Sequence, residues 1–419
     1  MLGFETTGNA TVIVYDGVPI LVTDPWIQGG AYFGSWGLSH AIPLAQRDAI
    51  SRSKFFWFSH AHPDHLNIET LTNFSDKQIL IADHYGKRIE NDLRGMGFNI
   101  RRSPDREWIQ LSPRIKVLTM ADENQDSVLL IDVGGRLIID LNDAMPKLGK
   151  RVIRPIAREY AHSYLLRLWG YGDSNMINMF SEDGERILPS GGRDHVALGR
   201  WVSADAKRFK ARYAIPFSSF HRYQRSDSIW ANQFTTPLED FYRWSDPSQP
   251  PILPAFLQVN CETGEHIALN PPANDEIVRA PEDFGDDWGD PLEKDEKVAL
   301  HAYFERKEAL HDKFGFLRFR VGGVETTIDL NPKLRNIGIS FEVPRHSLTT
   351  AVEYRIFDHL MIGNFMKTTL HGSARLYPGF TPYVAKYSDN GLAESRQQLD
   401  KYFHQLPQSG SAWIRSEAH

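Results

Sequence analysis

Three histidines and one aspartate fall within six consecutive residues, directly after the apolar run FFWF. Side chains two apart on a strand point the same way, so His60 and His62 can aim at one point. Pro63 cannot continue a regular ladder, so the chain can turn and bring Asp64 and His65 to a neighbouring point. Neutral imidazoles and a carboxylate suit Zn²⁺, Fe or Mn²⁺. We therefore predict a metal site here, the alternative being a histidine-rich polar loop.

The elements around this motif are predicted to be strands interleaved with helices, a mixed α/β class. Two apolar, β-branched stretches have hairpin turns, one at Asp16-Gly17 and the other at Gly134-Gly135. FFWF and QILIAD are short strands buried on both faces, and RYAIPFSS is a further strand that leads into a polar loop. The motif therefore follows a strand, where a sheet can position it.

The length of 419 residues exceeds what one hydrophobic core usually organises. We predict a metal-binding domain over 1–270, an acidic, Pro- and Gly-rich linker or exposed flap over 271–296, and a small α+β unit over 297–419. Within that last unit, FLRFRV, TTIDL and GISFEV alternate like strands, and residues 357–372 are predicted to form an amphipathic helix.

The pattern H-x-H-x-D-H after a buried strand resembles the signature of the metallo-β-lactamase superfamily. Asp24-Pro25-Trp26 matches the turn that ends the leading hairpin in that family. The resemblance covers about the first half of the chain and implies an αββα sandwich that carries two divalent metal ions. It also implies the ligands: His60 and His62 for one ion, Asp64, His65 and His221 for the other, and Asp143 as the bridge, with Asp64 and His221 as catalytic residues.

One position departs from the family pattern. A further histidine is usual just before the hairpin that carries the bridging aspartate, and here the stretch is MADENQD. We expect Asp122 or Glu123 to replace it, and the alternative is that the first ion binds weakly or not at all. A carboxylate ligand shifts the expected metal from zinc toward iron.

The chain is also similar to the lactamase-fold part of the CMP-N-acetylneuraminate hydroxylase family and its lactonase-like relatives. The spacing from Asp122 to Asp143, the stretch IPFSSF…RSD and the stretch DHLMIGNFMKTTLHG carry this likeness. That family also has a Rieske cluster, which needs two cysteines and two histidines. Cys261 is the single cysteine, so the likeness implies fold and ancestry but not that hydroxylation chemistry.

Other polar residues near the motif are weaker predictions. Arg222 and Arg225 follow His221 and can grip an anionic substrate, although a solvated loop explains them equally well. Tyr171 lies where relatives have a substrate-facing loop. The remaining histidines lack ligand spacing and are expected to be surface or packing residues, with His195 the best exception: His40, His84, His162, His195, His266, His301, His311, His346, His359, His371, His404 and His419.

The net charge of the chain bears on which binding partners are expected. The net charge of −6 gives no reason to expect nucleic acid or an anionic membrane. We see neither a signal peptide nor an apolar run long enough to span a bilayer, so a cytoplasmic protein is expected. The leading hypothesis is a hydrolase that acts on an ester, lactone, amide or phosphoester of a small molecule, anionic molecules included. A dinuclear iron oxygenase and a non-catalytic binding module are the alternatives, and no motif specifies the substrate or the oligomeric state.

Overall fold

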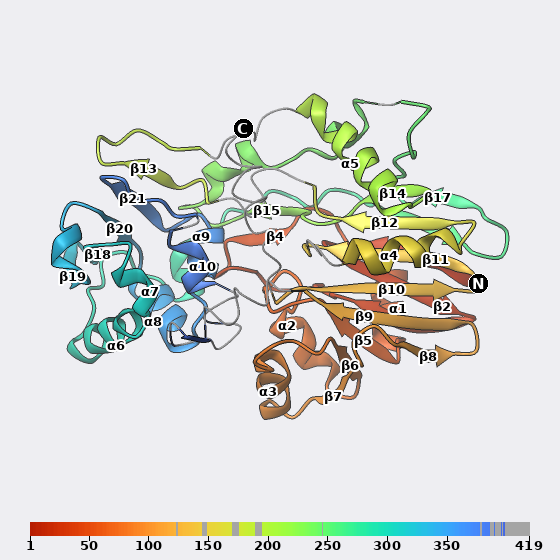
Figure 1. Ribbon diagram of the computed structural model, residues 1–419, viewed down its shortest axis with the longest axis horizontal. Coiled ribbons are helices and arrows are strands. Elements are labelled where there is room, and N and C mark those ends of the chain that lie inside the picture. The colour runs from red at the N-terminus through yellow and green to blue at the C-terminus, as the bar shows by residue number, and fades with distance from the viewer. Residues whose placement is uncertain are drawn as a thin grey trace.

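The computed structural model describes residues 1–122, 125–144, 149–169, 176–188, 195–244, 246–377 and 379–385, together with 389, 395 and 397–398. They form a large lobe, built mostly from the first 270 residues, and a smaller lobe built mostly from the C-terminal part (Figure 1). Among the described residues, no helix is both long enough and apolar enough to cross a bilayer.

The first sheet of the large lobe has eight strands in the order β17-β16-β1-β2-β3-β5-β6-β7. Its N-terminal strands form an antiparallel meander, and β3, β5, β6 and β7 are parallel. The predicted hairpin at Gly17 is confirmed, since β2 and β3 pair across it. The strands are β1 (Leu2–Thr7), β2 (Thr11–Asp16), β3 (Val18–Thr23), β5 (Phe55–Phe58), β6 (Gln78–Ile81), β7 (Asn99–Arg102), β16 (Leu257–Asn260) and β17 (His266–Ala268).

The second sheet has six strands in the order β14-β12-β11-β10-β9-β8. Its central hairpin is the one predicted: Val133 pairs with Arg136, and Gly134 and Gly135 between them both have positive φ, as a two-residue type I′ turn requires. The strands are β8 (Trp108–Ser112), β9 (Ile115–Ala121), β10 (Ser127–Val133), β11 (Arg136–Asn142), β12 (Ser163–Arg167) and β14 (Tyr213–Pro216).

Helices cover the outer faces of both sheets, so the lobe is an αββα sandwich, as expected. One core lies between the sheets and includes Phe4, Trp57, Leu129 and Ile138. A second core packs the first sheet against its helices, and a third does the same for the second sheet. The helices are α1 (Leu44–Arg52), α2 (Ile68–Leu71), η1 (Thr72–Phe74) and α3 (Arg88–Gly95) on one side, and α4 (Gly149–Arg158) and α5 (His195–Phe209) on the other.

The smaller lobe contains a five-stranded sheet in the order β13-β21-β20-β18-β19. Strand β13 comes from the first half of the chain and pairs in parallel with β21, so this lobe includes a segment that lies within the predicted first domain. The strands are β13 (Met179–Ser181), β18 (Phe316–Val321), β19 (Val324–Asp329), β20 (Gly338–Glu342) and β21 (Lys367–His371). The helices are α6 (Lys294–Glu305), α7 (Glu308–His311), η5 (Pro332–Leu334), α8 (Arg345–Glu353), α9 (Phe357–Ile362) and α10 (Thr381–Val384).

The predicted helix over 357–372 is wrong beyond its first 6 residues. Helix α9 ends at Ile362, and Asn364 has φ +56, a left-handed conformation that a helix cannot continue through. The β-branched residues of KTTLH then form strand β21.

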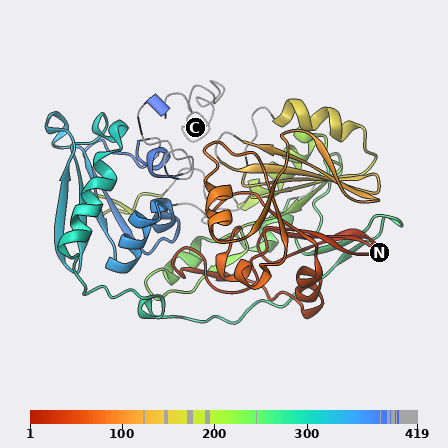
Figure 2. The ribbon, with the colours of Figure 1, turned by 90° about the horizontal axis from the view of Figure 1, so that it is seen from below.

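The remaining elements join the lobes. Strands β4 (Trp36–Leu38) and β15 (His221–Tyr223) pair with each other, and the short helices are η2 (Ile229–Phe234), η3 (Leu238–Tyr242) and η4 (Pro281–Phe284). Residues 271–296 run along one side of the molecule from the large lobe to the small one (Figure 2). Most of this connection is exposed, but Pro281, Asp286 and Leu292 are buried and anchor it.

Candidate metal centre

The histidine motif occupies the turn between the C-terminal end of β5 and helix α2. The amides of His65 and Leu66 both donate to the carbonyl of His62, which closes the turn after the strand. Asn67 then caps α2 by accepting the amide of Thr70, and its side-chain nitrogen donates to the Pro63 carbonyl. These hydrogen bonds join neighbouring residues, so the local sequence fixes the loop without a bound metal ion.

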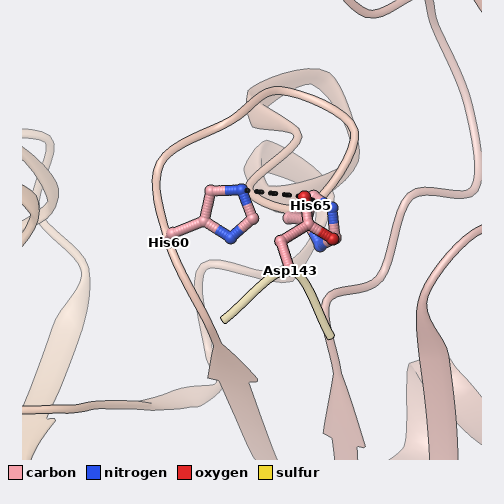
Figure 3. Close-up of side chains that lie close together, drawn as sticks. All are labelled: His60, His65 and Asp143. Atoms are coloured by element: carbon pink, nitrogen blue, oxygen red, sulfur yellow. Dashed lines mark ion pairs between the residues drawn. The ribbon is translucent and has the colours of Figure 1, made fainter. Parts of the chain in front are cut away.

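Asp143 reaches the motif from the second sheet, one residue beyond the end of β11. Its Oδ2 lies 3.8 Å from His60 Nε2 and 3.6 Å from His65 Nε2. Each of the three residues offers one ligand atom to a group whose atoms all lie within 4.8 Å of one another (Figure 3). Two imidazoles and a carboxylate converge here, with Asp143 between the histidines.

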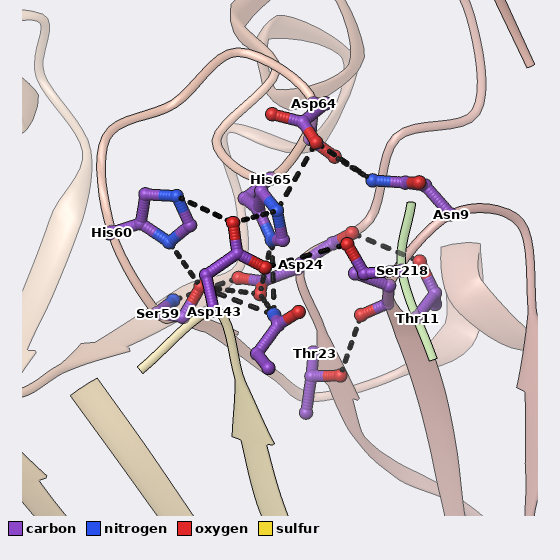
Figure 4. Close-up of polar contacts among 12 residues, drawn as sticks. Asn9, Thr11, Thr23, Asp24, Ser59, His60, Asp64, His65, Asp143 and Ser218 are labelled. Carbon is purple, nitrogen blue, oxygen red and sulfur yellow. Dashed lines mark hydrogen bonds and ion pairs between the residues drawn. The ribbon is translucent and has the colours of Figure 1, made fainter. Parts of the chain in front are cut away.

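Two buried aspartates orient the histidine rings. Asp24 Oδ2 lies 3.0 Å from His65 Nδ1 and also accepts the hydroxyl of Ser59 and the amide of Asn142 (Figure 4). Asp126 Oδ1 lies 3.2 Å from His60 Nδ1. A carboxylate on Nδ1 fixes the tautomer and leaves Nε2 to bind a metal, which is the usual outer-shell arrangement of metal-binding histidines.

Asp64 lies beside this group and is held on both oxygens. Tyr32 donates its hydroxyl to Oδ1 at 2.6 Å, and Asn9 donates its amide to Oδ2 at 3.0 Å. Burial opposes ionisation, but His65 and His62 outweigh it and lower the pKa of Asp64. Burial and the Asp64 carboxylate raise the pKa of Tyr32 well above its ordinary value, so Tyr32 remains a donor. Asp64 is therefore an ionised, fixed acceptor.

The charges of the centre favour a cation. Burial alone lowers the pKa of His65, but Asp64 and Asp143 outweigh it and raise that pKa well above its ordinary value. The field that draws a proton to His65 would equally attract a divalent metal ion.

His221 supplies a further buried imidazole. Its ring stacks on Trp36 with centroids 3.4 Å apart, and its Nδ1 lies 3.0 Å from Ser219 Oγ. Its Nε2 is buried and has no hydrogen-bond partner among the described residues. Burial lowers the pKa of His221 to about 3, against the influence of nearby Asp64. A neutral ring with an unpaired buried nitrogen is what a metal ligand needs, so the residues present fit a bound cation.

His62 turns to a different partner from the one that the resemblance implies. Its Nε2 lies 3.2 Å from Asp358 Oδ2 of helix α9, and a second group of possible ligands consists of His62, Asp358 and His359. The rings of His60 and His62 are nevertheless neighbours, with centroids 4.7 Å apart, so the two groups adjoin. Burial lowers the pKa of His359 to about 4.

Sequence reasoning missed the contributions of Asp126, Asp358 and His359. Nothing near His359 has ligand spacing, so the sequence predicts a surface or packing residue, and the contact between Asp358 and His62 joins residues 296 positions apart. For Asp126 a signal existed, since it directly precedes the apolar strand β10.

Arg225 is not a substrate-binding residue, contrary to our prediction. Its guanidinium is fully buried and pairs with Asp227 and Asp286, each at 2.8 Å. Arg222 alternates with the inward residues His221 and Tyr223 on β15 and donates to the carbonyl of Asn274, and its role in substrate binding stays a prediction. Arg225 therefore has structural partners in place of a substrate.

The replacement predicted for the missing histidine is only partly described. Asp122 Oδ1 accepts the amide of Asp126 at 3.2 Å, which closes the turn between β9 and β10. Glu123 and Tyr171 lie outside the described residues, and so does the side chain of His195, the first residue of α5.

No family model matches the chain. Among curated proteins it is similar to cytidine monophosphate-N-acetylneuraminic acid hydroxylases. The one from Asterias rubens is 29% identical over 153 residues, which make up 34% of this chain and 23% of that protein. The one from Mus musculus is 26% identical over 146 residues, 33% of this chain and 25% of that protein. The matches thus span about a quarter of the relatives' length.

Solved structures to which the chain is similar include a metallo hydrolase from Ignicoccus hospitalis, at 16% identity and a TM-score of 0.35, covering 51% of this chain and 82% of that one. A diiron β-hydroxylase from Streptomyces venezuelae has 15% identity and a TM-score of 0.36, covering 59% of this chain and 48% of that one.

Proposed function

We propose that this chain, which has the metallo-β-lactamase fold, is a metal-dependent hydrolase of a small-molecule ester, lactone, amide or phosphoester. The observation that carries the proposal is the convergence of the buried His60 and His65 rings on Asp143. Beside Asp64 lies His221, whose Nε2 has no hydrogen-bond partner within the part of the chain that the structure describes. Divalent cations bound by these residues would polarise a substrate oxygen and lower the pKa of water to roughly 7.

The chain's own residues have distinct tasks in this proposal. Asp64, ionised and fixed by Tyr32 and Asn9, accepts a hydrogen bond from the attacking water and orients it. Asp24 keeps His65 in one tautomer. Asp143 is the most open member of its group, with 16% of its side chain exposed against 1% or less for the two histidines, so a substrate approaches from its side.

A dinuclear iron oxygenase is the second candidate. Two observations favour it: the curated relatives are hydroxylases, and carboxylates are numerous around the histidines, as iron prefers. This reaction consumes O₂ and needs electrons from an external donor, whereas hydrolysis needs neither.

The experiment is elemental analysis of protein produced in zinc- and iron-replete medium, followed by assays against lactones, phosphoesters and amides. About two equivalents of zinc or manganese with hydrolysis supports the hydrolase, since a dinuclear centre binds two ions. Iron with a charge-transfer band and O₂ consumption selects the oxygenase. Protein without metal overturns both.

Two matched variants test whether metal binding and activity depend on this centre. Asp143→Ala is expected to lose both metal and activity. His301→Gln, on α6 and outside both ligand groups, is the control and should keep both. Equal loss in the two variants would show that the effect is not specific to the centre.

A further inference from the structure

Helix α9 of the smaller lobe places two buried side chains against the histidine motif. Asp358 and His359 are only 2% and 7% exposed. The Asp358 carboxylate lies 3.2 Å from His62 Nε2, and the rings of His359 and His62 have centroids 5.7 Å apart. The two lobes thus meet at the motif itself.

We propose that the smaller lobe completes the metal centre, with Asp358 and His359 joining His62 as ligands of one of its cations. This inference rests on the proposed metal-dependent function and adds ligands that the motif does not contain. The centre then consists of two groups of ligands, each with two imidazoles and one carboxylate. The first group is His60, His65 and Asp143, and the second is His62, Asp358 and His359.

The geometry of the second group suits a shared ion. A tetrahedral ion with ligand distances of about 2.1 Å separates its ligand atoms by roughly 3.4 Å. The 3.2 Å between His62 Nε2 and Asp358 Oδ2 is close to that value, and all three ligand atoms lie within 4.8 Å of one another. His359 Nε2 is buried and has no hydrogen-bond partner among the described residues. A nitrogen in that state is available to a cation.

Tyr32 links this group to the rest of the centre. Its ring packs edge-on against both His62 and His359, with centroids 5.9 and 5.5 Å away. Its hydroxyl donates to Asp64 at 2.6 Å. One side chain of the large lobe therefore holds Asp64 and supports both imidazoles of the second group.

The end of α9 is fastened to the large lobe by several hydrogen bonds. Ser35 donates to the Gly363 carbonyl at 2.6 Å, and Asn364 donates to the Tyr223 hydroxyl at 2.8 Å. Within the smaller lobe, Asn364 also accepts the amide of Ile177, two residues before β13. These contacts hold Asp358 and His359 at the centre as fixed parts of it.

A simpler role for Asp358 is to orient His62, as Asp24 orients His65. The two roles predict different results. An orienting carboxylate can be replaced by an amide oxygen, which still accepts a hydrogen bond, and His359 would then have no part in metal binding. A ligand carboxylate cannot be replaced in that way.

The test uses the full chain, stripped of metal and titrated with Zn²⁺ by calorimetry, with bound zinc counted by elemental analysis. Asp358→Asn and His359→Gln are near-isosteric and should preserve the fold, which circular dichroism checks. His371→Gln is the control, a part-buried histidine of the same lobe that bonds Ser340 at 2.8 Å. We expect the wild type and the control to bind two zinc ions. Each α9 variant should lose more than about 100-fold in zinc affinity at one site, which is more than the loss of a residue that only orients a ligand causes.

Two ions bound with unchanged affinity by His359→Gln would overturn this inference and leave the hydrolase proposal standing. No zinc bound by the wild type would overturn both. X-ray absorption on zinc-loaded protein gives a second readout, which reports the ligands themselves. Fewer imidazole ligands per zinc in His359→Gln than in the wild type support the inference, and an equal number overturns it.

Discussion

Arg225 is expected to be among the most important single residues for stability, because it joins three parts of the chain. Its Nη2 and Nε contact Asp227 at 2.8 and 3.1 Å, and its Nη1 contacts Asp286 at 2.8 Å. The same Nη1 donates to the Phe33 carbonyl at 2.9 Å, and the guanidinium lies 4.1 Å from the ring centroid of Phe365. The large lobe, the connection and the smaller lobe therefore meet on one cation.

Replacing Arg225 with Met keeps most of the packing but removes the charge. Asp286 has no exposed side-chain surface, so it would remain buried without its cation. Breaking a buried pair in this way costs about 3–5 kcal/mol. Ser347 still donates its amide and hydroxyl to Asp286, at 2.8 and 2.6 Å, which stabilises the carboxylate partly. We therefore expect the lower end, a loss of about 3 kcal/mol in the free energy of unfolding.

Urea unfolding of the metal-free protein, followed by circular dichroism, measures this loss. Arg279→Met is the matched control: its partner Asp283 lies 3.4 Å away and both side chains are over 40% exposed, so a change of at most about 1 kcal/mol is expected. Asp286→Asn removes the orphaned charge, so the double variant should lose less than the sum of the two single variants. A loss below about 1 kcal/mol for Arg225→Met would refute the reasoning.

Two further predictions concern buried titratable groups. Burial, followed by the charge of Asp24, raises the pKa of Asp140 well above its ordinary value. The folded protein then keeps a proton that the unfolded chain loses near pH 4, so stability falls as pH rises from there through the folded-state pKa, by up to about 1.4 kcal/mol per pH unit. Asp140→Asn in metal-free protein should flatten this dependence between pH 5 and 8, measured by urea unfolding, and an unchanged slope would contradict it. Burial raises the pKa of Cys261 to about 12, and the residue is 6% exposed. We therefore expect no reaction with a thiol reagent at pH 8 until urea unfolds the chain, and fast labelling of folded protein would contradict this.

The local sequence was enough to predict the elements whose partners are close in the chain. Both predicted hairpins form, because their turns place residues of positive φ between β-branched strands. The motif of residues 60–65 adopts a turn at a strand end because Pro63 interrupts the ladder and Asn67 caps the next helix. These outcomes depend on neighbours a few residues apart, which a single sequence contains.

Partners distant in sequence could not be inferred in this way. For Arg225, the nearby Asp227 could have indicated an ion pair, but Asp286, which buries the cation, is 61 residues away. Asp358 and His359 looked like ordinary polar positions on an amphipathic helix, because periodicity shows which face of a helix is apolar and not which surface that face meets. The sheet register of β13 with β21 is a third such case.

The position of the centre explains why these distant contacts matter. Asp143 and the motif come from the ends of strands in the two sheets of the sandwich, whereas Asp358 and His359 come from a lobe that Arg225 and Asn364 hold in place. If α9 supplies ligands, a cation bound there connects the lobes directly and stabilises their docked arrangement by its binding free energy. Substitutions at Arg225, far from Asp358 and His359 in sequence, would then weaken metal binding through the position of α9. Metal affinity would thus report on how the lobes pack.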